Sequence, residues 1–148
     1  MIIKALRTIL EWRFLSELKI NNGKMTVEIV RHLIDIDLKF IVILDLENNQ
    51  ISSQEVKVLA LCENLCYLTD LSLKKNKIGN RGINYLSSAQ WPHLKTLNLA
   101  HVGSTTQGLN YLRKKTLPEI KVLNYSFNID KLGCLRTLLE LDIQSIKL

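Results

Sequence analysis

The 148-residue sequence has few cysteines, few aromatic residues and no long hydrophobic run, and each shortage excludes a class of protein. The three cysteines, Cys62, Cys66 and Cys134, are odd in number and lack the spacing of a disulfide framework, which argues against a small disulfide-stapled secreted domain. Cys62 and Cys66 have no histidine or further cysteine beside them, so they make a poor zinc site. We expect both to be buried as small apolar side chains.

Charged residues interrupt every apolar segment of the chain. Lys4, Arg7, Glu11 and Arg13 divide the N-terminal segment, which therefore does not match a signal peptide. No stretch approaches the roughly 20 apolar residues of a membrane-spanning helix. We therefore expect a cytoplasmic protein in a reducing compartment, or one that acts in a host cytosol if it is a secreted effector.

Apolar residues make up 47% of the chain, and aromatic residues make up only 6%. Leucine and isoleucine dominate the apolar share. This composition suits a single folded domain over residues 1–148 and is too apolar for a disordered chain. The formal net charge is +6, with lysine and arginine spread along the whole sequence. The two densest basic clusters fall at 74–81 and 113–121, and we expect them to be mainly solvated turns and helix ends.

An internal repeat organises the sequence. Residues 68–78 read L-x-x-L-x-L-x-x-N-x-I, and residues 41–51 match the same pattern with isoleucine in the first place. The second apolar anchor recurs at intervals of 26 or 27 residues, at Leu18, Leu44, Leu71, Leu97 and Leu123. A weaker sixth copy has its anchor at Leu141, only 18 residues later, and the apolar chain end at 146–148 can form a last strand.

Each copy of the repeat predicts a strand, a turn and a helix. Alternation in L-x-L directs both leucines to one face of a short strand, and neighbouring copies can align their strands into a parallel sheet. A buried asparagine at the turn can satisfy backbone groups that the turning chain leaves unpaired. Helical spacing follows over residues 26–38, 52–65, 80–89 and 105–115, each beginning beside a serine, threonine or asparagine suited to capping. Ser52 and Glu55 have the spacing of a capping box.

The pattern at residues 68–79, L-x-x-L-x-L-x-x-N-x-I-G, resembles the leucine-rich-repeat superfamily, specifically its ribonuclease-inhibitor-like class. The resemblance covers about residues 15–130. It implies an α/β solenoid in the form of a curved right-handed superhelix, with short parallel strands on the concave side and helices on the convex side. Five to six repeats would occupy residues 15–148, the last one short.

The sequence departs from the family pattern at several places. Val102 stands where asparagine is expected, and Asn128 is followed by Ile129 one residue early, which leaves the form of the last three turns open. The cysteine-rich repeats of ribonuclease inhibitor itself are absent, so the resemblance does not imply its target.

A solenoid exposes its core at both ends unless these are covered. Residues 1–14 can form a capping helix with Ile2, Leu6, Leu10 and Phe14 toward the first coil, and the alternative is a helix on a membrane surface. An uncovered C-terminal coil would allow oligomer formation.

No residue pattern predicts catalysis. His32, His93 and His101 have no acidic or cysteine neighbour at ligand spacing, and the carboxylates of Asp35 and Asp37 flank a helix end. The phosphate-binding, dinucleotide-binding and nucleophile-elbow motifs are absent. We therefore expect no enzyme, no catalytic residue, no metal, no cofactor and no small-molecule substrate.

The concave face is the expected binding surface, because the side chains between the strand leucines project there. This face is mixed in charge and rich in amides, which fits recognition of another protein. We expect partner contacts at Asp45, Glu47, Asp70, Ser72, Lys74, Asn98 and His101.

Other functions stay open as alternatives. The chain can be the substrate-recognition part of an adaptor, or of an effector that a pathogen delivers into host cells. A different class of function is binding of RNA or acidic membrane through the two basic clusters. The acidic residues on the concave face disfavour phosphate binding there.

Overall fold

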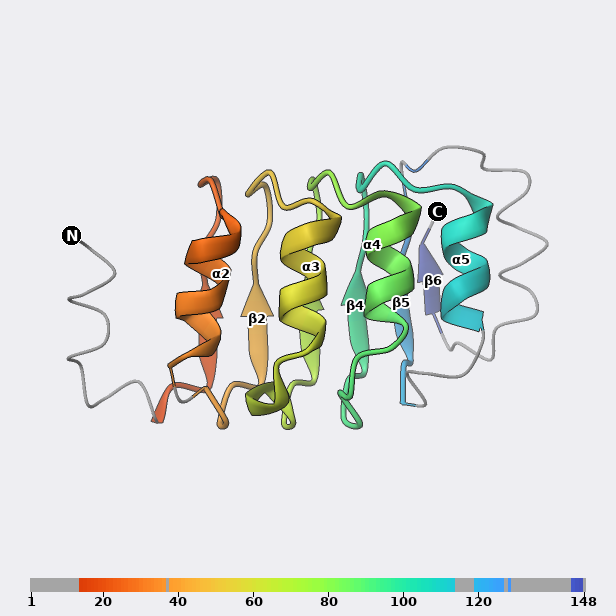
Figure 1. Cartoon of the computed structure of the whole chain (residues 1–148). Coiled ribbons are helices and arrows are strands. Elements are labelled where there is room, and N and C mark those ends of the chain that lie inside the picture. Colours follow the sequence, from red (N-terminus) through yellow and green to blue (C-terminus); the bar gives the residue numbers. More distant parts are fainter. Residues whose placement is uncertain (1–13, 37, 114–118, 127, 129–144, 148) are drawn as a thin grey trace.

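The computed structural model describes residues 14–36, 38–113, 119–126, 128 and 145–147 (Figure 1). The predicted N-terminal capping helix therefore lies outside the described residues, apart from Phe14. The side chain of Phe14 is 75% exposed.

The strands form one six-stranded parallel sheet whose spatial order follows the sequence. Its members are β1 (Glu17–Lys19), β2 (Ile43–Asp45), β3 (Asp70–Ser72), β4 (Thr96–Asn98), β5 (Val122–Asn124) and β6 (Ser145–Lys147). The register aligns the predicted anchors, with Leu18 opposite Leu44, Leu44 opposite Leu71, and so on to Leu123. The predicted parallel α/β arrangement is confirmed.

The apolar chain end forms the last strand, β6, in which Ile146 stands opposite Leu123. A last strand at residues 146–148 was one expectation from the sequence. The predicted sixth copy with its anchor at Leu141 lies outside the described residues.

A helix follows each of the first four strands, and we call a strand with its turn and helix one coil. The helices are α2 (Val27–Ile34), α3 (Ser53–Ala60), α4 (Gly79–Leu86) and α5 (Thr106–Arg113), with a short 3₁₀ turn, η2 (Glu63–Leu65), after α3. All four lie side by side on one face of the sheet, and α3 contacts both α2 and α4 (Figure 1). The first three helices are shorter than predicted, and the residues that follow α5 lie outside the described residues.

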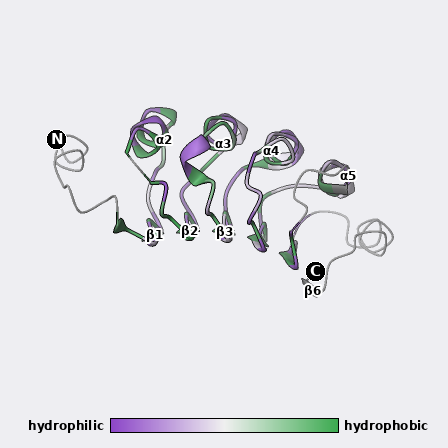
Figure 2. Cartoon of the chain, turned by 90° about the horizontal axis from the view of Figure 1, so that it is seen from below, coloured by the Kyte–Doolittle hydropathy of each residue, from purple (hydrophilic) through white to green (hydrophobic). Residues whose placement is uncertain are grey.

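The two layers curve, with the strands on the inner side of the arc (Figure 2). The cause is a difference in width. Strands pair at about 4.8 Å, whereas adjacent helices need roughly 10 Å between their axes. A row of helices is therefore longer than the row of strands to which it is connected, and the sheet bends away from the helices.

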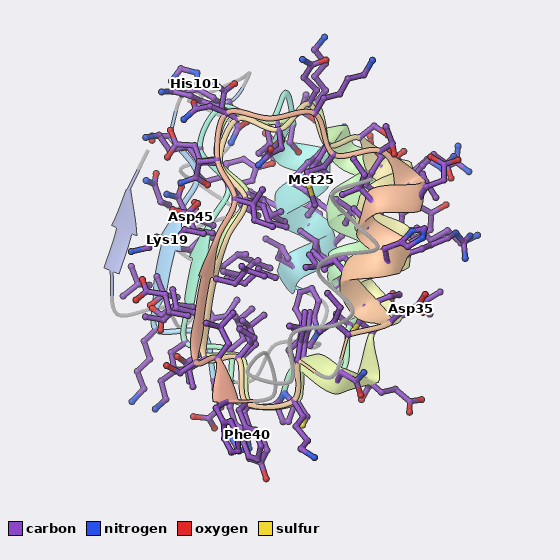
Figure 3. The ribbon with its side chains drawn as sticks, turned by 90° about the vertical axis from the view of Figure 1, so that its left-hand side faces the viewer. Lys19, Met25, Asp35, Phe40, Asp45 and His101 are labelled. Atoms are coloured by element: carbon purple, nitrogen blue, oxygen red, sulfur yellow. The ribbon has the colours of Figure 1, made fainter. Side chains whose placement is uncertain are left out.

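Leucine columns fill the space between the layers. The strand anchors are buried, as are the next residues on the same face, Leu46, Leu73, Leu99 and Tyr125. Trp91 takes the place that Leu38 and Leu65 occupy in earlier coils. Figure 3 shows Met25 between the strands and the helices. These columns make one continuous apolar core across the coils.

Buried asparagines at three of the turns, Asn49, Asn76 and Asn128, link the turn to the preceding coil. Asn76 Oδ1 accepts hydrogen bonds from the backbone N–H groups of Asn49 and Ile51, both at 2.9 Å. Asn128 does the same for Val102 and Ser104, at 3.0 and 3.4 Å. The turn at Val102 therefore keeps the repeat geometry although its own side chain cannot take part.

The helix N-termini follow the predictions in part. The capping box of Ser52 and Glu55 is present, and Thr26 caps α2. In contrast, α4 begins after Ile78 without a side-chain cap. Asn80 instead reaches the next coil, where its Oδ1 accepts from the backbone N–H of Thr105 at 2.8 Å.

Candidate binding surface

The row of side chains between the strand leucines lies on the face of the sheet that the helices leave uncovered. Lys19, Asp45, Ser72, Asn98 and Asn124 stand in register on neighbouring strands. Figure 3 shows Lys19 and Asp45 on the side of the strands opposite the helices. We call this row, together with Glu47, Asp70 and Lys74, the inner face.

Several inner-face side chains hold the chain as it leaves the strand. Asp45 Oδ1 accepts from the backbone N–H of Glu47 at 3.0 Å. Asn98 makes the same bond to the N–H of Ala100, and Asn124 to that of Ser126, both at 3.2 Å. This repeated bond to the residue two positions on orients each carboxylate or amide. It leaves the amide nitrogens of Asn98 and Asn124 for a partner, whereas the second oxygen of Asp45 accepts from Asn21 Nδ2 at 3.2 Å.

Glu47 joins two coils by ion pairs. Its Oε1 lies 3.1 Å from Lys74 Nζ and 3.2 Å from Lys75 Nζ. Burial alone would raise the pKa of Glu47, but hydrogen bonds and charge from Lys74 and Lys75 outweigh it and lower this pKa below its ordinary value. The predicted contacts Glu47 and Lys74 thus form a fixed pair of opposite charges.

Asp70 and Ser72 lie at the centre of the sheet, and both are half-buried. The Asp70 carboxylate accepts a hydrogen bond from the hydroxyl of Thr69. Ser72 occupies the middle of the in-register row. A partner in this position would meet short side chains that leave room for it.

His101 belongs to a turn and not to the strand face. Its φ is +55°, and Asn22, Asn48 and Lys75 have similar left-handed conformations in the equivalent turns. Figure 3 shows His101 at the far end of the coil from Phe40. The structure therefore places six of the predicted contacts on the inner face and His101 at its rim.

The predicted basic cluster at 74–81 is divided between different partners. Lys74 and Lys75 pair with Glu47, while the Arg81 guanidinium lies over the Tyr85 ring at 5.8 Å. Residues 114–118 of the second cluster lie outside the described residues.

A second surface was not predicted from the sequence. Phe40, Tyr67 and His93 line an open groove of about 590 Å³ at the edge where the chain enters the strands. Phe40 and Tyr67 are exposed. The sequence feature that could have predicted this groove is a ring-bearing residue directly before the first residue of the repeat pattern in successive coils. The repeat pattern does not specify this position.

Metal or redox chemistry was considered for the cysteines and for the carboxylates of Asp35 and Asp37. Within the described ranges, no three histidine, cysteine or acidic residues come together as metal ligands. Cys62 is buried and Cys66 is half-buried, both as free thiols. Asp35 is exposed on the helix side (Figure 3), and Asp37 is outside the described residues. Among the helices that the structure describes, none is both long and apolar enough to cross a membrane.

Fold and surface together define an α/β protein with one parallel sheet, an uncovered inner face and an edge groove. No protein-family model matches the sequence, and no curated protein matches it. A solved structure described as leiomodin-1 actin-binding site 2 has a similar fold, with a TM-score of 0.67 and 20% identity. The match covers 84% of this chain and 76% of the leiomodin chain.

Proposed function

We propose that the chain is a leucine-rich-repeat solenoid of the ribonuclease-inhibitor-like class that binds a partner protein through its inner face and has no catalytic activity. The carrying observation is the in-register row of Lys19, Asp45, Ser72, Asn98 and Asn124 on the uncovered side of the sheet. Repetition of one coil extends such a row into a surface large enough for a protein partner.

The chemistry of the inner face favours a protein over a nucleic acid. Carboxylates at Asp45, Glu47 and Asp70 would repel phosphates, whereas amides and hydroxyls between them can match the polar groups of a folded partner. The leiomodin-1 structure is described as an actin-binding site, which gives a case of protein binding by a similar fold. It does not identify the partner of this chain.

Substitution at the centre of the inner face tests the proposal. Ser72→Arg places a long charged side chain in the middle of the row, whereas Asn84→Arg makes the same change of charge at an exposed position of α4. Each variant and the parent chain would be immobilised and exposed to native cytosol. A bound protein would then be purified, and its affinity measured at low and at physiological salt.

We expect the parent chain and N84R to bind the same protein, and S72R to bind it at least about tenfold more weakly. Binding that survives S72R unchanged would contradict the inner face as the contact surface. Recovery of only RNA or lipid, with affinity that falls steeply as salt rises, would contradict a protein partner.

A further inference from the structure

The edge groove is built from equivalent positions of three coils. A ring stands immediately before the first residue of the repeat pattern in each of these coils. The three rings are Phe40, Tyr67 and His93, and the buried residues that follow them are Ile41, Leu68 and Leu94. The pairing of successive strands therefore brings the three rings to one edge of the sheet. Figure 3 shows Phe40 at the end of the coil opposite His101.

The groove combines apolar walls with a cationic end. Its other lining residues are Val42, Thr69 and Lys95. Each occupies the same position in its repeat, immediately before β2, β3 or β4. Phe40 and Tyr67 are 45% and 53% exposed, and they are two of the few large apolar side chains that the described residues leave in solvent. An exposed apolar cluster with a polar rim is typical of an interaction site.

Neighbouring groups cover one face of each ring in the groove. Tyr67 and His93 are stacked on one another, with centroids 6.1 Å apart and planes 4° from parallel. The ammonium group of Lys39 lies 5.3 Å from the centre of the Phe40 ring. Because Tyr67 and His93 already contact one another, a nucleobase cannot insert between them, whereas an apolar side chain can pack across the exposed surface of the rings.

Charge selects among apolar ligands. Lys39 and Lys95 flank the rings, and Lys121 follows Lys95 on the next coil, its backbone N–H donating to the Lys95 carbonyl at 2.8 Å. Asp70 accepts a hydrogen bond from Thr69, and Glu119 occupies the ring position one coil beyond His93. The six residues that line the groove include Lys95 and no acid, so an acidic ligand is favoured.

We propose that the edge groove binds an acidic segment of a partner protein. An apolar side chain of that segment packs against Phe40 and Tyr67, and a neighbouring carboxylate pairs with Lys95. This site is additional to the inner face, because none of the predicted inner-face contacts lines it. The protein would then hold its partner at two surfaces, on the strand face and at the strand-entry edge.

A peptide selection on the intact chain tests the proposal. A random heptapeptide display library would be selected against the parent protein, and the most enriched peptide synthesised with a fluorescent label. Its affinity would be measured for the parent, Tyr67→Ala and Lys95→Glu. Tyr111→Ala in α5 and Lys57→Glu in α3 make the same substitutions on the helix layer and serve as matched controls.

We expect enriched peptides to carry aspartate or glutamate beside an apolar residue. Y67A and K95E should each weaken binding at least about tenfold, and the controls less than about twofold. Since Lys95 is exposed, K95E remains informative if Y67A proves unstable. Failure to enrich acidic peptides, or equal binding by K95E, would overturn the proposal. Binding of a short oligouridylate that K95E abolishes, without peptide binding, would overturn it in favour of nucleic acid.

Discussion

The side-chain oxygen of Asn76 accepts a hydrogen bond from the backbone N–H of Asn49, a residue of the preceding coil, at 2.9 Å. Asn49 in turn accepts from the N–H of Gly23 at 3.0 Å. The amide nitrogen of Asn76 donates to the carbonyl oxygens of Leu46 and Leu73 at 3.0 and 2.8 Å. One buried side chain thus closes its own turn and joins it to the previous one.

Replacement of Asn76 by alanine should therefore destabilise the protein strongly. Asn76→Ala leaves two buried N–H groups and several carbonyls without this partner, and each buried unsatisfied group costs about 1–3 kcal/mol. We expect the free energy of unfolding in urea to fall by about 3 kcal/mol or more. The control is Asn84→Ala on the exposed side of α4, for which we expect a change within about 0.5 kcal/mol. Similar stabilities for N76A and N84A would refute this role of the turn asparagine.

Gly108 in α5 should resist substitution by alanine. A Cβ at this position would lie 2.0 Å from Ser104 Oγ and 2.8 Å from Tyr125 Oη. Ser104 also donates to Asn80 Oδ1 at 2.7 Å, so its hydroxyl cannot move aside without breaking that bond.

In an unconstrained helix, a change from glycine to alanine stabilises by about 1 kcal/mol. We expect Gly108→Ala instead to lower the melting temperature, whereas Gln107→Ala at an exposed position of the same helix should leave it nearly unchanged. A G108A variant that melts at a higher temperature than the parent would show that Gly108 does not lie this close to Ser104 and Tyr125.

Glu47 should make stability depend on pH in the acid range. Its folded-state pKa lies below the ordinary value of 4.5, because Lys74 and Lys75 outweigh the effect of burial. For a lowered pKa, the stabilisation is complete above the unfolded-state value and is lost as pH falls through the folded-state value. We expect Glu47→Gln to lose about 0.5–1 kcal/mol at neutral pH, a small value because Glu47 remains partly exposed.

The difference between E47Q and the parent should vanish once Glu47 is protonated. Urea unfolding at a series of pH values measures it, with Glu119→Gln as a control carboxylate outside the ion pair. Carbon-13 NMR titration of Glu47 in the parent and in Lys74→Met gives a direct check, because the methionine should raise the Glu47 pKa. A Glu47 pKa at or above its ordinary value in the parent would contradict the structure.

The two described cysteines should differ in reactivity. Burial is the main cause that raises the pKa of the Cys62 thiol, and Cys66 lies four residues away at half-buried exposure. Thiolate, and not thiol, reacts with disulfide reagents. In a Cys134→Ser background, Ellman's reagent should modify Cys66 first, and Cys62 only as fast as the fold opens. Adding Cys66→Ser leaves only Cys62 to react, and adding Cys62→Ser leaves only Cys66. Faster labelling of Cys62 than of Cys66 in these two variants would contradict this order.

Most of the architecture was predictable because it is local and repeated. The interval between Leu18, Leu44 and Leu71 predicted the strand register correctly, and the residues following each strand predicted the four helices. The capping box at Ser52 was predictable from a spacing of three residues. In contrast, the sequence left the last strand open between a copy anchored at Leu141 and the chain end, because the position of this strand depends on pairing with β5 and not on its own leucine pattern alone.

Alternation along a strand correctly predicted that Asp45, Ser72 and Asn98 lie on the inner face, whereas their contact with a partner stays a prediction. His101 was less well placed, because the left-handed turn after β4 carries it off the strand face. The groove of Phe40, Tyr67 and His93 was missed for another reason. These residues precede the repeat pattern, and nothing in a single coil shows that they face solvent.

By itself, the sequence determined the period of the coil, the residues that point into the core and the positions of strands and helices, because these follow from hydrophobic spacing along a short stretch of chain. Only the tertiary structure decided which side chains meet between coils. Glu47 reaches Lys74 and Lys75, and Tyr67 stacks on His93, although about 26 residues separate the partners. Such contacts depend on the lateral stacking of coils, which sets distances that no local pattern contains.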